Sequence, residues 1–198
     1  MGSRQCWADP TVTELEDISI ILETTLGLIE IAIYARAAPR SAAAFLSYIE
    51  SGSFAAGGAF YRVVRGAEND HGTPPIDVVQ GGSLSPSNVF SEIDHEPTSE
   101  TGLRHLDGTV SLARKDGGRA IGAAFFICVG AQPVLDVGGG RVNDGKGFAA
   151  FGKVTNGMSV IRQIYNSATS PFAATPYRRG QMLDPMIRIL NAMRLDHV

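Results

Sequence analysis

The sequence has little cysteine, little net charge and no long apolar run, and each shortage excludes a class of protein. Two cysteines, Cys6 and Cys128, occur among 198 residues, which is too few for a disulfide framework or a cysteine-rich zinc site. The 17 basic and 20 acidic residues are interspersed and leave a net charge of −3, so nucleic acid is not an expected partner. No stretch approaches the roughly 18 apolar residues of a membrane span, so no membrane partner is expected either.

The apolar content is sufficient for a single domain. Hydrophobic residues make up 44% of the chain, enough to close one core. We expect residues 1–16 to form a flexible extension and residues 17–198 to form the folded domain. Because residues 1–16 lack the apolar segment of a secretory signal, we expect a soluble protein. The compartment stays open between the cytoplasm and the periplasm, the latter if a natural leader is absent from this sequence.

Short segments rich in β-branched and aromatic residues predict a mainly β fold. They cover residues 18–24, 28–34, 60–64, 77–80, 109–113, 124–129, 150–154 and 186–192. The first two surround Leu26-Gly27 and are typical of an antiparallel hairpin. Many short strands with few helices favour a closed barrel or a sandwich.

Two segments have helical periodicity instead. The first begins at Pro39 and ends before Gly52, with apolar residues at Ala42, Phe45, Leu46 and Ile49. The second covers about residues 158–166. Residues 137–147 and 67–75 are rich in turn-forming residues, so we expect loops there.

Polar residues interrupt two of the apolar strand faces. Strand alternation places Arg62 on the face of Phe60 and Val64, and Gln80 on the face of Val78. In the same way, Phe125 and Phe126 must point to opposite faces, so one ring fills the interior and the other faces outward. An outward phenylalanine needs a cover or a ligand.

Five motifs in order along the chain resemble those of cyclophilins, which are peptidyl-prolyl cis/trans isomerases. They are Phe60-x-Arg62-x-x-x-Gly66, Gln80-Gly81-Gly82, the stretch 108–113, Phe125-Phe126-Ile127 and the stretch 147–154. The resemblance spans about residues 18–194, and residues 96–113 and 147–154 look most like bacterial members. It implies a closed antiparallel eight-stranded β-barrel capped by two α-helices.

The resemblance also implies a role for individual residues. Arg62 would be the catalytic arginine and Gln80 its polar neighbour. The walls of a proline pocket and the adjoining peptide groove would be formed by Val78, Ala113, Phe126, Leu135 and Phe148, with Asp77 and Val134 at two further pocket positions. A guanidinium can stabilise a twisted X-Pro amide without a nucleophile, an acid/base pair or a cofactor.

The chain departs from the usual cyclophilin pattern at several places. Residues 67–76 form an apparent insertion, and Asp77 and Val134 stand where aromatic residues are usual. Arg114, Ala124 and Phe148 replace a usual asparagine, a usual glutamine and a histidine or tyrosine. These changes predict a shallower proline pocket and a reduced affinity for cyclosporin.

Other interpretations compete with this one. A metal site could be sought among His71, His95 and His105 and the nearby acidic residues, but no ligand spacing is diagnostic. The stretch 140–146 has the spacing of a phosphate-binding loop, yet Gly147 stands where a serine or threonine is needed. We therefore expect no metal and no cofactor.

Three functions stay open. We favour an active, monomeric isomerase that acts on proline-containing peptide segments of client proteins. The second is a cyclophilin-fold binding module with little turnover. The third is a chaperone-like assembly factor whose insertion or glycine-rich loop docks a partner.

Overall fold

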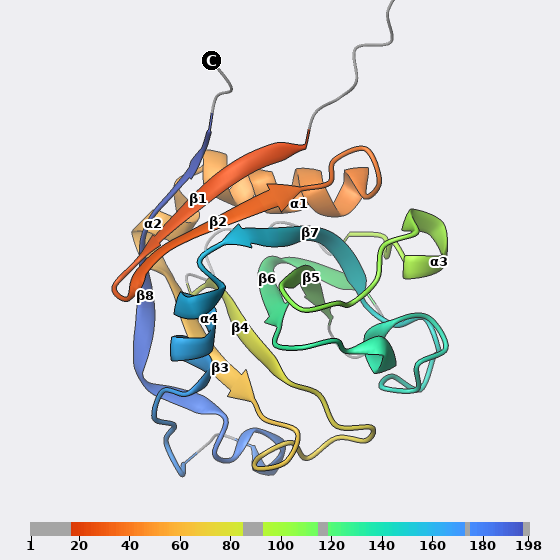
Figure 1. The fold of residues 1–198 in the computed structure, drawn as a ribbon, viewed down its shortest axis with the longest axis vertical. Helices are drawn as coiled ribbons and strands as arrows, with labels where there is room; N and C mark the ends of the chain where they lie inside the picture. Colours follow the sequence, from red (N-terminus) through yellow and green to blue (C-terminus); the bar gives the residue numbers. More distant parts are fainter. Residues whose placement is uncertain (1–16, 85–92, 115–118, 173–174, 196–198) are drawn as a thin grey trace, which may run out of the picture.

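Eight strands close into an antiparallel barrel in the computed structural model, which describes residues 17–84, 93–114, 119–172 and 175–195 (Figure 1). In chain order they are β1 (Ile18–Thr24), β2 (Gly27–Ile33), β3 (Gly58–Val64), β4 (Val78–Ser83), β5 (Thr109–Arg114), β6 (Ala120–Cys128), β7 (Ala149–Asn156) and β8 (Met182–Arg194). Around the barrel the order is β1-β2-β7-β5-β6-β4-β3-β8. The predicted closed barrel is confirmed. The predicted N-terminal extension, residues 1–16, lies outside the described residues.

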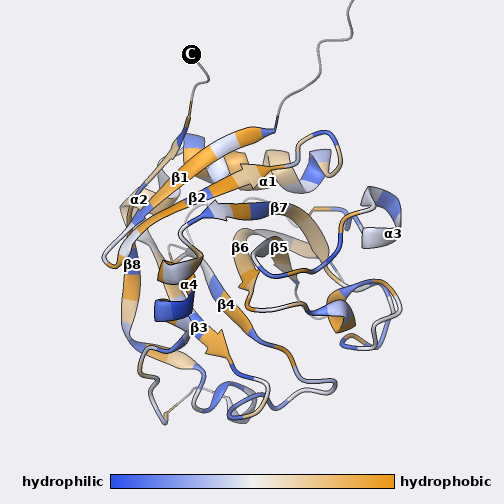
Figure 2. Cartoon of the chain, viewed as in Figure 1, coloured by the Kyte–Doolittle hydropathy of each residue, from blue (hydrophilic) through white to orange (hydrophobic). Residues whose placement is uncertain are grey.

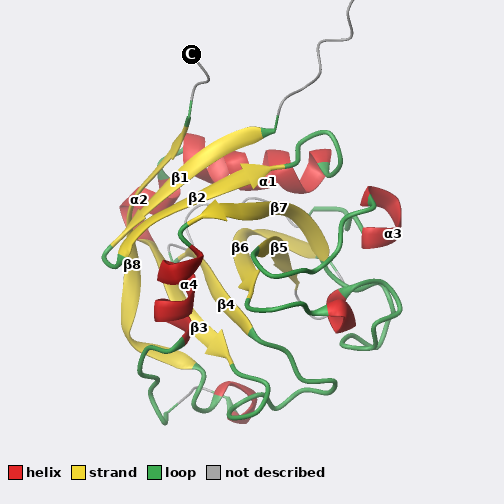
Figure 3. Cartoon of the chain, in the orientation of Figure 1, coloured by secondary structure: helices red, strands yellow, loops and turns green. Residues whose placement is uncertain are grey.

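Two longer helices pack against the barrel at different places (Figure 3). Helix α1 (Pro39–Glu50) contacts β6, β7 and β8, and α4 (Met158–Tyr165) contacts β2, β3 and β4. These are the two predicted helices. The described residues also form the shorter α2 (Ser53–Gly57) and α3 (Thr98–Thr101) and the 3-10 turns η1 (Pro133–Leu135) and η2 (Pro176–Arg178). Within the described ranges, no helix has the length and apolar character needed to cross a bilayer.

The barrel interior is the main hydrophobic core, and Figure 2 shows apolar residues concentrated along its strands. Alternation along β1 and β2 buries every second side chain, Ile20 and Leu22 among them. Aromatic rings fill the centre: the Phe125 ring lies 5.2 Å from that of Phe45 in α1 and 5.7 Å from that of Phe60 in β3. Helix α1 therefore completes the core with the apolar face that its sequence predicts.

A β-bulge in β3 changes which face its side chains occupy. The register shifts between Phe60 and Arg62, so that Phe60 pairs with Gly81 and Arg62 with Gln80, and Tyr61 is the extra residue. Phe60 consequently lies in the interior, whereas Arg62 and Val64 face outward. The prediction that Arg62 shares a face with Phe60 was wrong, because strict alternation does not continue through a bulge.

Two glycines after Gln80 allow the strands beside it to approach closely. A side-chain carbon at Gly81 would lie 2.9 Å from the Phe60 ring, and one at Gly82, where φ is +156°, would lie 2.2 Å from the carbonyl oxygen of Ala123. Larger residues here would push β3 or β6 away from β4. The glycine pair therefore maintains the wall from which Gln80 projects.

Candidate active site

A second apolar cluster lies on the outer face of the barrel wall, apart from the interior core. Its buried members are Val64, Ile76, Val78, Phe126, Cys128 and Leu135, and Phe148 and Val134 pack against them. The cluster forms the floor of a cavity of about 1200 Å³, and polar side chains from the surrounding loops line the rest. Such a site suits an apolar group carried on a polar chain.

The ring of Phe126 faces this cavity, whereas that of Phe125 lies in the barrel core. This confirms that the two rings point to opposite faces. The Phe148 ring meets Phe126 edge-on at a centroid distance of 5.3 Å, and the His105 ring stacks on it at 6.0 Å with an interplanar angle of 16°. The orientation of Phe126 is thus fixed by ring contacts with two neighbours.

His105 is fully buried and held by two polar partners. Its Nδ1 lies 2.7 Å from a carboxylate oxygen of Asp136, and its Nε2 lies 3.1 Å from the hydroxyl of Ser111. Burial lowers the pKa of His105, and the nearby Asp136 opposes this effect. A neutral ring that donates from Nδ1 and accepts at Nε2 satisfies both contacts.

Among the described residues, Arg62 is one of four arginines in the cavity lining. Its Nη1 donates to Gln80 Oε1 at 2.9 Å, and its Nε and Nη2 both donate to Gln181 Oε1, at 2.9 and 2.6 Å. The Tyr177 ring centroid lies 5.5 Å from its central carbon. Burial lowers the pKa of Arg62, with Tyr177 opposing, but a guanidinium keeps its proton at any physiological pH. A fixed positive charge therefore adjoins the apolar floor.

Arg114 joins the cavity wall to the glycine-rich loop. Its side chain is 5% exposed, donates to the Asp144 carboxylate and to the carbonyl oxygen of Gly147, and lies over the Phe148 ring. The hydrogen bond from Arg114 lowers the pKa of Asp144 to about 2. Arg114 therefore holds the loop that carries Asp144 and Gly147 against the cavity wall.

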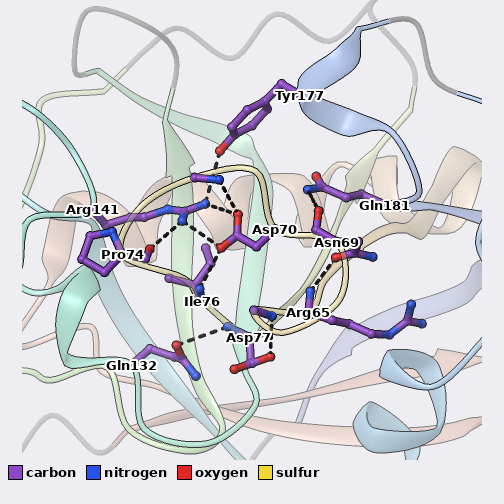
Figure 4. A network of polar contacts seen from close by, with 12 residues as sticks. Arg65, Asn69, Asp70, Pro74, Ile76, Asp77, Gln132, Arg141, Tyr177 and Gln181 are labelled. Atoms are coloured by element: carbon purple, nitrogen blue, oxygen red, sulfur yellow. Dashed lines mark hydrogen bonds and ion pairs between the residues drawn. The ribbon is translucent and has the colours of Figure 1, made fainter.

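Residues 67–76, the insertion predicted from the sequence, fold against the same loop through a buried ion pair (Figure 4). Arg141 donates from both Nη atoms to the two carboxylate oxygens of Asp70, at 2.8 Å each, and also to the carbonyl oxygen of Pro74. Asp70 accepts two further bonds from the amides of Gly72 and Ile76. Burial raises the pKa of Asp70, but these hydrogen bonds outweigh it and hold the pKa below its ordinary value. The insertion is therefore part of the cavity rim.

Most of the predicted site residues come together at this cavity. Its lining includes Arg62, Val78, Gln80, Ala113, Phe126, Leu135 and Phe148. Asp77 and Val134 are not part of the lining. The Asp77 carboxylate accepts bonds from Gly66 N at 2.9 Å and from the Tyr165 hydroxyl at 2.5 Å, so it points towards α4. Its neighbour Ile76 lines the cavity instead.

Several residues that line the cavity or contact its arginine carry no signal in the sequence. Tyr177 and Arg178 belong to η2, and Gln181 follows them just before β8. Gln181 is 119 positions from Arg62 along the chain, and no motif or periodicity relates the two. Tyr61 could have been identified only by recognising the bulge.

Comparison with known proteins gives the family. The model of the cyclophilin type peptidyl-prolyl cis-trans isomerases matches residues 19–192. The chain belongs to this family. Peptidyl-prolyl cis-trans isomerase A of Dickeya dadantii is 32% identical over 173 residues, which cover 84% of this chain and 83% of that protein. A peptidyl-prolyl cis-trans isomerase of Acinetobacter baylyi is 28% identical and covers 91% of this cyclophilin.

Solved structures agree with the fold of this cyclophilin. A Cryptosporidium parvum cyclophilin type isomerase superposes with a TM-score of 0.67 at 17% identity, covering 92% of this chain and 99% of that one. A second structure of that protein, obtained in the presence of the dipeptide Ala-Pro, gives a TM-score of 0.65. Among the described residues of this cyclophilin, no three His, Cys, Asp or Glu side chains gather as a metal site would require.

Proposed function

We propose that this cyclophilin accelerates cis/trans isomerisation of X-Pro bonds in peptide segments of other proteins, and that Arg62 stabilises the twisted amide. The observation that carries the proposal is the juxtaposition of a fixed guanidinium with an open apolar pocket. Membership of the cyclophilin family supports the activity.

The chemistry of the substrate explains why this juxtaposition would be enough. Resonance gives the peptide bond a rotation barrier of about 18–20 kcal/mol, so unaided X-Pro isomerisation takes tens to hundreds of seconds. Rotation breaks the resonance and leaves a lone pair on the prolyl nitrogen. A hydrogen-bond donor aimed at that lone pair binds the twisted state more strongly than the planar one, which lowers the barrier.

Two parts of the site would bind two parts of the substrate, the proline ring and the flanking chain. The proline ring would lie on Phe126, enclosed by Val78, Ile76, Leu135 and Phe148. The flanking chain would pass over the small side chains of Ala113 and Ala124, which leave the groove wide. With the ring held, rotation moves the chain on the other side of the bond. The replacement of a usual glutamine by Ala124 should reduce the affinity for cyclosporin.

The first experiment is a cis-to-trans relaxation assay on a short X-Pro peptide with wild type and Arg62→Ala at equal concentration. We expect the variant to lose at least about tenfold in kcat/KM, or roughly 1.4 kcal/mol of barrier lowering. Arg162→Ala removes an arginine that is 52% exposed and absent from the cavity lining, so it should leave turnover unchanged. Circular dichroism checks that all three proteins are folded.

The rival function is a peptide-binding module with little turnover. This function would be expected if the groove, widened where Ala124 replaces a usual glutamine, binds the peptide too loosely for catalysis. If wild type binds X-Pro peptides but does not accelerate relaxation, this rival replaces the proposal. If wild type is active and Arg62→Ala equals it, the isomerase proposal survives and the role of Arg62 is refuted.

A further inference from the structure

Gln181 is a fully buried polar residue that contacts Arg62 through its side chain. It lies between η2 and the first residue of β8, and its exposure is 0%. Burying an amide side chain is unfavourable unless its donors and acceptor are satisfied. The side chain of Gln181 satisfies them through hydrogen bonds to Arg62 and to the backbone of Asn69.

The side-chain oxygen Oε1 of Gln181 holds one edge of the Arg62 guanidinium. It accepts from Nε at 2.9 Å and from Nη2 at 2.6 Å, while Gln80 accepts from Nη1 at 2.9 Å. A guanidinium has five N–H donors, and these three bonds use one on each nitrogen. The remaining two donors belong to Nη1 and Nη2, and neither is used by Gln80 or Gln181.

The side-chain nitrogen Nε2 of Gln181 is in turn hydrogen-bonded to the insertion (Figure 4). It donates to the carbonyl oxygen of Asn69 at 2.6 Å. Asn69 is fixed at its other end, because its Nδ2 donates to Gly180 O at 2.7 Å and its Oδ1 accepts from Arg65 N at 2.7 Å. The backbone of the insertion therefore determines the direction in which the side-chain oxygen Oε1 of Gln181 points.

We propose that Gln181 is a positioning residue, which holds Arg62 in its reactive orientation and connects that orientation to residues 67–76. This inference rests on the proposed function, since it takes Arg62 as the group that stabilises the twisted amide. A long arginine side chain has many rotamers, and a catalyst that must reorganise it at each turnover loses the benefit of a fixed dipole. Two bonds to one oxygen remove this freedom at the Nε edge.

The test compares two buried glutamines replaced by methionine, which keeps the length of the side chain and removes its hydrogen bonds. Gln181→Met should lower kcat at least about fivefold and change the Kd for an X-Pro peptide by less than about twofold. Gln132→Met is the matched control. Gln132 is 6% exposed and bonds Asp77 N and Val129 O without contacting Arg62, so this variant should keep turnover near wild type.

Two further readouts separate positioning from a general loss of structure. In the Arg62→Ala background, Gln181→Met should lower turnover no further, because its effect acts through the absent guanidinium. In nitrogen-15 spectra, the Nε–H signal of Arg62 should be sharp and slowly exchanging in wild type, unchanged in Gln132→Met, and shifted and fast exchanging in Gln181→Met.

The outcomes distinguish this inference from the proposed function. Equal losses for Gln181→Met and Gln132→Met, an equal loss with and without Arg62, or an unchanged Nε–H signal in Gln181→Met would each overturn the positioning role. An inactive wild type would refute the proposed function, and the Nε–H signal would still decide whether Gln181 fixes Arg62.

Discussion

Phe125 and Phe126 are neighbours in β6 with nearly equal exposure, 0% and 5%, yet their surroundings differ in kind. Phe125 lies in the interior core and contacts the rings of Phe45, Phe54 and Phe60. Phe126 has an open cavity on one side and a hydrogen-bonded histidine on another. The inner face is mainly an apolar core, whereas the outer face borders a cavity that polar groups from distant loops also line.

The largest expected effect is on the inner face. Phe125→Ala should lower the free energy of unfolding by about 3–5 kcal/mol, because it leaves a void among packed rings. Phe126→Ala should cost less, roughly 1–2 kcal/mol, since the ring borders an open cavity. Denaturant titration measures both, and the relaxation assay should show the larger loss of turnover for Phe126→Ala.

This contrast has a clear way to fail. If Phe126→Ala destabilises the protein more than Phe125→Ala does, the outer cluster is part of the stabilising core rather than a binding surface. Should Phe125→Ala not fold, Phe125→Leu provides the comparison with a smaller void, and Phe126→Leu is its matched partner.

The second prediction concerns the polar support of the outer face. Arg141→Met removes one partner of the buried pair with Asp70, whose side chains are 5% and 0% exposed, and should cost about 3 kcal/mol of stability. Arg162→Met removes a surface partner of Asp107, where both side chains are about half exposed, and should cost less than about 1 kcal/mol. Equal costs measured by denaturant titration would mean that the Asp70 pair does not hold the insertion in place.

The same contrast explains how much of the molecule its sequence predicts. The barrel strands and both longer helices follow from local periodicity, because each buries a regular apolar face. The inner face is thus predictable from short segments. Arg62, Gln80 and Phe126 of the outer face were predicted from motifs that resemble a known family, and they lie together at the cavity.

The outer face needs information that local patterns do not contain. Its rim depends on pairs of ordinary polar residues that are distant in sequence, such as Asp70 with Arg141 and Arg62 with Gln181. Asp77 was predicted at the pocket by motif position, but the adjoining insertion turns Ile76 inward in its place. A single bulge at Tyr61 defeated the alternation argument for Arg62.

The smallest expected effect is the pH dependence of the histidine beneath Phe126. Burial lowers the pKa of His105 from its ordinary 6.5, so the unfolded chain binds a proton more readily than the folded protein does. Stability from this group is complete above pH 6.5 and is lost as the pH falls from 6.5 towards the folded pKa. Unfolding titrations at pH 7.5 and pH 5 should show a smaller loss of stability for His105→Gln than for wild type. An equal loss in the two proteins would assign the acid sensitivity to other groups. A selective rescue by His105→Gln would instead show that the neutral ring, through its contacts with Asp136 and Ser111, is the form that supports Phe126.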